Sequence, residues 1–150
     1  NYKIAVIVEA LTDNKNRTAS NIREIFQKNG GNLGTQGSAA HNFKHLGIIR
    51  VGSEQIDADS MLEIAINSGA EECFSNKFYH EIHCNKENVY DVKKVMENKI
   101  NNFLTTNIEW YPLNKVNLKK EQFLEAKKFL DTLEDHDDVQ KVYSNLEMLV

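Results

Sequence analysis

The apolar residues of this chain fall into two alternating patterns, which restrict it to folds that combine strands with helices. Residues 4–11 read Ile-Ala-Val-Ile-Val-Glu-Ala-Leu, a short and almost continuously apolar run that is typical of a central strand. From Thr18 onward the apolar positions recur at helical spacing instead, and Gly30-Gly31 supplies a left-handed stop. The sequence therefore predicts a strand, a polar loop and a helix at its start.

The same reasoning divides the rest of the chain into short elements. Two strands are predicted over residues 39–44 and 48–51, joined by a turn at His45-Leu46-Gly47. The remaining predicted elements are a helix that begins at Asp57 or Asp59, a hairpin over 71–74 and 78–84, a helix from about Glu87, a strand over 105–111, a helix over 119–133 and a strand over 139–145.

This order of elements predicts an α+β fold in which one domain is inserted into another. A ferredoxin-like split βαβ domain needs the order βαββαβ, and the first four elements together with the last two supply it. We therefore expect a discontinuous ferredoxin-like domain made of residues 1–54 and 111–150. Residues 55–110 would form a second, small α/β domain inserted into the first.

Charge is distributed unevenly over these expected domains. The chain has 18 Lys and Arg residues against 22 Asp and Glu residues, which gives a formal net charge of −4. By segment, the charge is +3 for residues 1–54, −5 for 55–110 and −2 for 111–150. The acidic balance argues against a protein that binds nucleic acid over its whole surface, whereas the basic first segment leaves room for a local patch.

Composition also indicates where the chain works. No apolar run approaches the roughly 18 residues of a membrane span, so no membrane partner is expected. The two cysteines, Cys73 and Cys84, cannot make a disulfide framework and indicate thiols of a reducing compartment. We expect a cytoplasmic protein, or a protein of the mitochondrial matrix if the source is a eukaryote.

No motif in the sequence supports an enzyme. The glycines at 30–34 follow a helix and match neither the phosphate loop nor the dinucleotide fingerprint, and no serine lies in a Gly-x-Ser-x-Gly elbow. His80 and His83 are three residues apart on a predicted strand, so their side chains should point to opposite faces rather than to one metal ion. The acidic turn at 134–138 is interpreted as a solvated helix end. We therefore predict no catalytic residue, no metal and no cofactor.

The residues with the clearest binding character lie in the basic first segment. Arg and Lys side chains can meet phosphates, while Asn, Gln and exposed backbone amides can meet ribose or base edges. The alternative is that these residues merely cap the first helix and solvate it, and the sequence leaves both interpretations open. The candidate nucleic-acid-binding residues are Asp13, Asn14, Lys15, Asn16, Arg17, Arg23, Asn32, Thr35, Gln36, Ser38, Lys44 and Arg50.

Several stretches of the chain resemble one known family. Residues 8–18, Val-Glu-Ala-Leu-Thr-Asp-Asn-Lys-Asn-Arg-Thr, and residues 30–34, Gly-Gly-Asn-Leu-Gly, resemble specific signatures of the YebC family. The resemblance continues through residues 64–71 and 130–145, so it extends over nearly the whole chain. The family includes bacterial proteins described as transcriptional regulators and the mitochondrial translational activator of cytochrome c oxidase subunit I.

The resemblance implies a three-domain protein, and the two domains predicted here look like the second and third of these. The basic N-terminal helical domain expected before residue 4 is missing from this chain. The resemblance also implies a non-enzymatic regulator of gene expression, and we expect a translation factor that contacts the ribosome or RNA. One alternative is a DNA-binding transcriptional regulator. Another is a pair of protein-interaction domains, in which acidic residues 55–110 dock a protein partner and the missing domain binds nucleic acid.

Overall fold

The structure is a computed structural model that describes residues 3–34 and 37–148. The chain forms two compact units, one made of Asn1–Lys44 with Tyr111–Val150 and the other of His45–Trp110. The first boundary, expected between residues 54 and 55, therefore lies between Lys44 and His45, and the second lies between residues 110 and 111.

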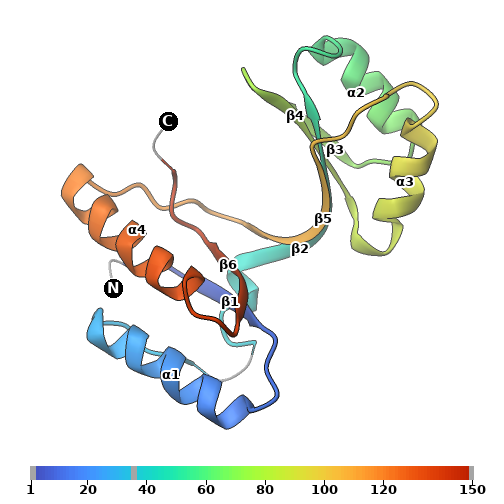
Figure 1. The fold of residues 1–150 in the computed structure, drawn as a ribbon. Helices are drawn as coiled ribbons and strands as arrows, with labels where there is room; N and C mark the ends of the chain where they lie inside the picture. Colours follow the sequence, from blue (N-terminus) through green and yellow to red (C-terminus); the bar gives the residue numbers. More distant parts are fainter. Residues whose placement is uncertain (1–2, 35–36, 149–150) are drawn as a thin grey trace. The chain divides into compact units, whose positions relative to one another are not determined.

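The first unit packs two helices on a two-stranded sheet. Strands β1 (Val6–Ala10) and β6 (Val139–Ser144) pair antiparallel. Helices α1 (Lys15–Lys28) and α4 (Lys120–Glu134) lie side by side (Figure 1). A short 3-10 helix, η1 (Ala40–Asn42), follows the loop after α1.

The core of the first unit lies between these helices and one face of the sheet. Ile22 and Phe26 of α1 are buried together with Leu133 of α4, and valines of β1 and β6 pack against them. The rings of Phe26 and Phe129 meet edge to face with their centroids 5.1 Å apart. The inner face of α1 is thereby fixed, and the polar side chains on its other faces are left at the surface.

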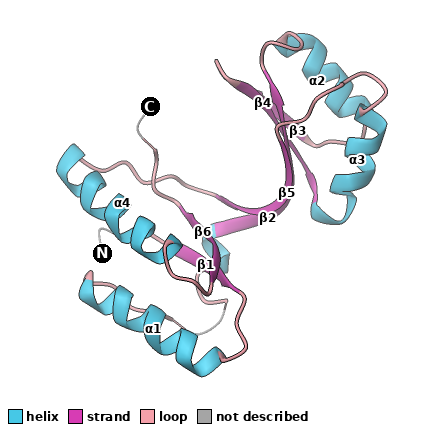
Figure 2. Ribbon diagram, viewed as in Figure 1, coloured by secondary structure: helices cyan, strands magenta, loops and turns pink. Residues whose placement is uncertain are grey.

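The second unit is a four-stranded sheet with two helices on one face. Its elements in chain order are β2 (Phe43–Gly52), α2 (Ala58–Asn67), β3 (Glu72–Ser75), β4 (Tyr79–Asn85), the 3-10 helix η2 (Lys86–Asn88), α3 (Val89–Met96) and β5 (Thr105–Pro112). The strands are ordered β3-β4-β2-β5, and α2 and α3 lie on the same side of them (Figure 2). Met61 of α2 and Val92 of α3 are buried against Ile49 and Ile82 of the sheet.

The prediction of two strands over residues 39–44 and 48–51 is wrong. Residues 40–42 form η1, and the single strand β2 runs straight through the predicted turn at Gly47. A Cβ atom at Gly47 would meet the Cβ of Val89 at 2.5 Å and the Sγ of Cys84 at 3.0 Å, so this glycine allows a close approach within a packed strand. In the sequence, a glycine that serves close packing is indistinguishable from one that turns the chain.

This correction changes which unit has the split βαβ order. The elements β2-α2-β3-β4-α3-β5 follow the order βαββαβ of the ferredoxin-like fold. The first unit, in which we expected that order, instead pairs β1 with β6 in a two-stranded sheet among its described residues. The predicted α+β class is confirmed, because helices and antiparallel strand pairs make up both units.

Replacing Gly47 with alanine is expected to destabilise the chain by about 1–3 kcal/mol, because the added methyl group overpacks a buried contact. Both neighbours, Val89 and Cys84, are fully buried and have little room to move. The change in the free energy of unfolding is measured by urea unfolding, with circular dichroism as the signal. An unchanged midpoint would contradict the close approach of β2 to α3.

Candidate nucleic-acid interface

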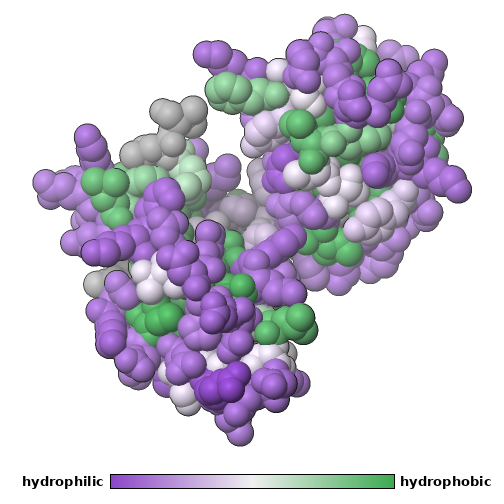
Figure 3. Space-filling view, viewed as in Figure 1, coloured by the Kyte–Doolittle hydropathy of each residue, from purple (hydrophilic) through white to green (hydrophobic). Residues whose placement is uncertain are grey.

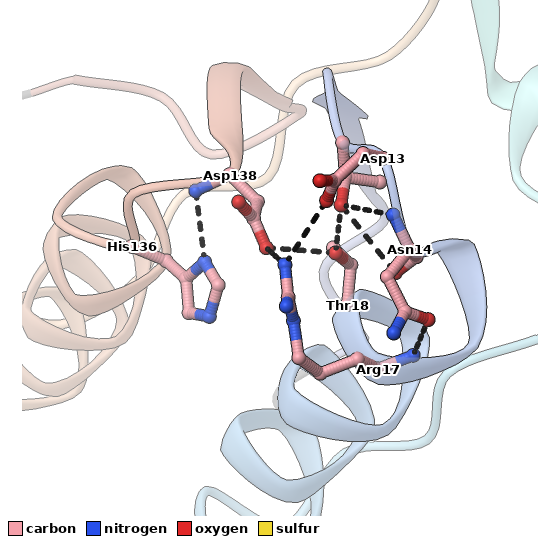
Figure 4. Close-up of polar contacts among 7 residues, drawn as sticks. Asp13, Asn14, Arg17, Thr18, His136 and Asp138 are labelled. Atoms are coloured by element: carbon pink, nitrogen blue, oxygen red, sulfur yellow. Dashed lines mark hydrogen bonds and ion pairs between the residues drawn. The ribbon is translucent and has the colours of Figure 1, made fainter.

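The loop between β1 and α1 contains the densest group of candidate residues, and one of them, Asn14, caps the start of the helix. Asn14 is the N-cap of α1, where its Oδ1 accepts a hydrogen bond from the Arg17 backbone N–H at 3.0 Å. The backbone N–H of Asn14 donates to Thr12 Oγ1, also at 3.0 Å. A side-chain cap of this kind stabilises a helix by about 1 kcal/mol. The Asn14 side chain therefore has a structural role (Figure 4).

A buried hydroxyl then ties the start of α1 to the turn before β6. Thr18 is 4% exposed, and its hydroxyl lies 2.8 Å from Thr12 Oγ1 and 2.8 Å from Asp138 Oδ2. Because a carboxylate can only accept, Thr18 donates to Asp138. The backbone carbonyl of Asp138 accepts from the Leu11 N–H at 2.9 Å, and its N–H donates to His136 Nδ1 at 3.1 Å. We call Thr12, Thr18 and Asp138 the threonine–aspartate latch; Thr18 and Asp138 are labelled in Figure 4.

Arg17 lies at the surface beside the latch, and its guanidinium forms ion pairs with two carboxylates. Its Nη2 is 3.5 Å from Asp13 Oδ1 and 3.7 Å from Asp138 Oδ2. The side chains of Arg17 and Asp13 are 53% and 94% exposed, so this pair contributes at most about 1 kcal/mol. Arg17 can still approach a phosphate, whereas Asp13 adds negative charge at the same place. The structure thus brings Asp13, Asn14 and Arg17 together at the N-terminus of α1.

Lys15, Asn16 and Arg23 are all exposed on α1. In the part of the chain that the structure describes, neither Lys15 nor Arg23 takes part in an ion pair. Asn16 and Arg23 are seven positions apart, which is about two helical turns and places them on the same side of α1. Ser20 and Gln27 are exposed and extend this side at a spacing of four. We call Asn16, Ser20, Arg23 and Gln27 the α1 polar row.

The other candidates of the first unit lie away from the N-terminus of α1. Asn32 is exposed but comes after the C-terminus of α1, which is separated from Lys15 by about 20 Å of helix. Ser38 and Lys44 are exposed as well, and Ser38 folds back over Gly34, where a Cβ atom would collide with its hydroxyl. Thr35 and Gln36 lie outside the described residues.

Arg50 belongs to the second unit and has its charge paired there. Its Nη1 lies 2.7 Å from Glu109 Oε2 and its Nε 3.1 Å from Glu81 Oε1, and the side chain is 23% exposed. Glu81 also accepts a hydrogen bond from His83 Nε2 at 2.8 Å. We call Arg50, Glu81, Glu109 and His83 the β-sheet charge cluster. The neutralising glutamates leave Arg50 poorly suited to hold a phosphate, so we omit it from the interface.

The pKa values of Arg50 and Glu81 follow from the geometry of this cluster. Burial alone would lower the pKa of the Arg50 guanidinium, but the hydrogen bond and negative charge of Glu109 raise it above its ordinary value. Burial likewise raises the pKa of the Glu81 carboxyl, but the His83 hydrogen bond and the Arg50 charge outweigh it and hold that pKa below its ordinary value. Both side chains are therefore charged at neutral pH.

The two histidines of β4 point to opposite faces of the sheet, as their spacing predicts. His80 lies within hydrogen-bonding distance of Ser75 Oγ, at 2.6 Å, and of the Ile56 carbonyl, at 2.7 Å, whereas His83 contacts Glu81. Among the described residues, no three His, Cys, Asp or Glu side chains are grouped so that they could hold a metal ion. Across residues 3–34 and 37–148, no helix combines the length and the apolar character needed to cross a membrane.

Sequence reasoning missed the threonine–aspartate latch. Thr12 and Thr18 bracket the start of a predicted helix, which is a signal for local capping. Asp138 is 120 positions from Thr18, and the sequence carries no signal that would pair them. The acidic turn that contains Asp138 looked solvated, but the side chain of Asp138 is only 21% exposed.

Comparisons with known proteins show the family of this chain and two similar proteins. The sequence-family model that describes the second and third domains of TACO1/YebC proteins matches residues 1–146. A probable transcriptional regulatory protein of Pelagibacter ubique (strain HTCC1062) is 60% identical over 144 residues, which cover 96% of this chain and 60% of that protein. The crystal structure of a conserved hypothetical protein from Aquifex aeolicus superposes with a TM-score of 0.84 at 36% identity, over 97% of this chain and 60% of that one. The chain therefore spans about three fifths of the length of each.

Proposed function

Because the chain belongs to the TACO1/YebC family, we propose that it is a non-enzymatic regulator of gene expression that contacts RNA on the ribosome. The contact is made by the outer surface of α1, through Lys15 and the α1 polar row, with Arg17 beside them. A role in translation places the protein where ribosomes are, in the cytoplasm or, in a eukaryote, in the mitochondrial matrix.

The observation that supports this proposal is that the polar side chains at the start of α1 and along its surface have two different roles. Asn14 and Thr18 are used to cap α1 and to hold the latch, while Lys15 and Arg23 keep charges that no carboxylate of the described chain balances. Cations of this kind meet phosphates, and the amides of Asn16 and Gln27 can meet ribose and base edges.

The small number of free cations sets the strength of the contact. With about two phosphates neutralised, the logarithm of the affinity for single-stranded RNA should fall with the logarithm of salt concentration with a slope of about −1.4. Binding to isolated RNA should therefore be weak and only mildly sensitive to salt.

Reversing both charges in the double variant Lys15→Glu, Arg23→Glu should lower ribosome co-sedimentation about tenfold or more at low salt, because two attractive contacts become repulsive. Both side chains are exposed, so the melting temperature should change little. Lys120→Glu is the matched control, since Lys120 is an exposed lysine at the start of α4 in the same unit. Equal sedimentation of the double variant and the control would refute the interface.

DNA is the second candidate ligand, because the relative from Pelagibacter ubique is named a transcriptional regulatory protein. The α1 polar row contains Asn16, Arg23 and Gln27, and Asn, Gln and Arg are the side chains that read adenine and guanine in the major groove. A gel-shift comparison of a selected duplex with a scrambled one separates the two functions. A specificity ratio of 10³ or more would favour DNA over RNA.

The acidic second unit is a candidate surface for a protein partner. Residues 55–110, which form most of this unit, have a net charge of −5, which suits a basic partner such as a ribosomal protein. Crosslinking of the chain to ribosomes distinguishes the two kinds of contact. Protein adducts on this unit without RNA adducts on α1 would assign the binding function to protein contacts.

A further inference from the structure

On the face of the molecule in Figure 3, hydrophobic side chains occur as small patches among hydrophilic ones. A different kind of feature lies in the first unit, where a groove of ≈ 940 Å³ is bounded by the start of β1, the C-terminal end of α1 and the second half of α4. Its volume is in the range of sites that enclose a ligand or a peptide side chain. None of the residues assigned to RNA contact on α1, Lys15, Asn16 and Arg23, lines it.

The floor of this groove is apolar. Ile4, Phe26, Phe129 and Leu130 line it. Phe26 and Leu130 are each 8% exposed, whereas Ile4 and Phe129 are partly exposed. The rings of Phe26 and Phe129 meet edge to face with their centroids 5.1 Å apart. The accessible surfaces of Ile4 and Phe129 therefore suit an apolar side chain that inserts from outside.

The rim of the groove is mostly basic. Lys3, Lys28 and Lys128 line it together with the single carboxylate of Glu125. The ammonium of Lys28 lies 2.9 Å from Glu24, but these two side chains are 72% and 64% exposed, so the pair is weak and an incoming carboxylate can compete with it. The rim therefore attracts an occupant that carries negative charge.

We propose that this groove binds an acidic peptide segment of a partner protein, with an apolar side chain on the floor and carboxylates against the rim lysines. A nucleic acid fits less well, since single strands bind by stacking bases on exposed aromatic faces. Phe26 is buried and its ring already packs against that of Phe129. Peptide backbone can also bond to the amide side chains of Asn29 and Asn32, which line the same groove.

Fluorescence anisotropy with a labelled twelve-residue peptide of alternating Glu and Leu tests this proposal. The chain should bind this peptide, and the double variant Lys28→Glu, Lys128→Glu should bind it about tenfold more weakly. Thr132→Trp should also weaken binding, because Thr132 lies on the groove wall and a larger side chain there occupies the space without changing charge. Lys120→Glu, away from the groove on α4, should bind as the unmodified chain does.

Two further probes fix the chemistry of the occupant. A peptide with Lys in place of Glu, and one with Ser in place of Leu, should both fail to bind. Equal binding of either, equal binding by the double variant, or no binding by the unmodified chain would overturn the proposal. Displacement of the peptide by single-stranded oligouridylate would overturn it in favour of RNA. The variant Lys15→Glu, Arg23→Glu should bind the peptide normally, so failure of the RNA interface and failure of the groove are separable.

Discussion

Replacing Arg50 with methionine should destabilise the chain by about 3 kcal/mol and lower the melting temperature by roughly 6–12 °C. The substitution removes the cation between Glu81 and Glu109, whose side chains are 14% and 16% exposed. Two carboxylates then remain close together with little access to water, which is the costly outcome of breaking a largely buried ion pair. Thermal unfolding at neutral pH measures the change.

The pH dependence of this effect has a definite sign. The folded-state pKa of Glu81 lies below its ordinary value, so the charged carboxylate stabilises the fold above the unfolded pKa, and this stabilisation is lost as the pH falls through the folded pKa. In Arg50→Met, Glu81 loses the nearby positive charge that helps to hold its pKa low, so it takes up a proton more readily. The difference in stability between the variant and the unmodified chain should therefore be largest at neutral pH and should shrink toward acid.

A neutral replacement of Arg50, Glu81 and Glu109 together is the control for this result. Combining Arg50→Met with Glu81→Gln and Glu109→Gln removes the charges together, so most of the lost stability should return. If the triple variant were as unstable as Arg50→Met, then lost packing rather than unpaired charge would be the cause.

Breaking the threonine–aspartate latch should have the second-largest effect. Asp138→Ala removes the carboxylate that accepts from the Thr18 hydroxyl at 2.8 Å, and a hydrogen bond to a charged group contributes about 1.5–3 kcal/mol. The Thr18 side chain is buried, so water replaces the lost acceptor poorly. We expect a loss of about 2 kcal/mol in urea unfolding.

The neighbouring acid provides a matched control. Asp137 is in the same turn but is exposed, so Asp137→Ala should change the stability by less than about 0.5 kcal/mol. Comparable losses in Asp137→Ala and Asp138→Ala would show that the charge of the turn, and not the latch, matters.

Elements with a strong local pattern were predictable from the sequence. The apolar period and the flanking polar residues gave α1, α2 and α4, and Gly30 has the positive φ, 77°, expected at a helix C-terminus. The strand β2 was mistaken for two strands because Gly47 serves a contact with α3, which only the folded chain reveals. That single error assigned the split βαβ order to the wrong unit.

The sequence predicts Asp13–Arg17 as a candidate region, but it does not indicate which of these residues have structural roles. The role of Asn14 depends on cap geometry, and the paired state of Arg50 depends on Glu81 and Glu109. These partners are distant in the sequence, because β2, β4 and β5 meet only after folding. Exposure and pairing therefore separate candidate contact residues from structural ones, which residue type alone does not.

The central claim is that the threonine–aspartate latch holds the start of α1 in place, while Lys15 and Arg23 on the surface of α1 contact RNA. Ribosome co-sedimentation of Asp138→Ala and of Lys15→Glu, Arg23→Glu, measured well below the melting temperature of both, tests it most directly. The account predicts that Asp138→Ala sediments with ribosomes at least as well as the unmodified chain, despite its lower stability, because Arg17 loses a neighbouring carboxylate. The double variant should be lost from the pellet. Retention of the double variant, or loss of folded Asp138→Ala, would contradict the account.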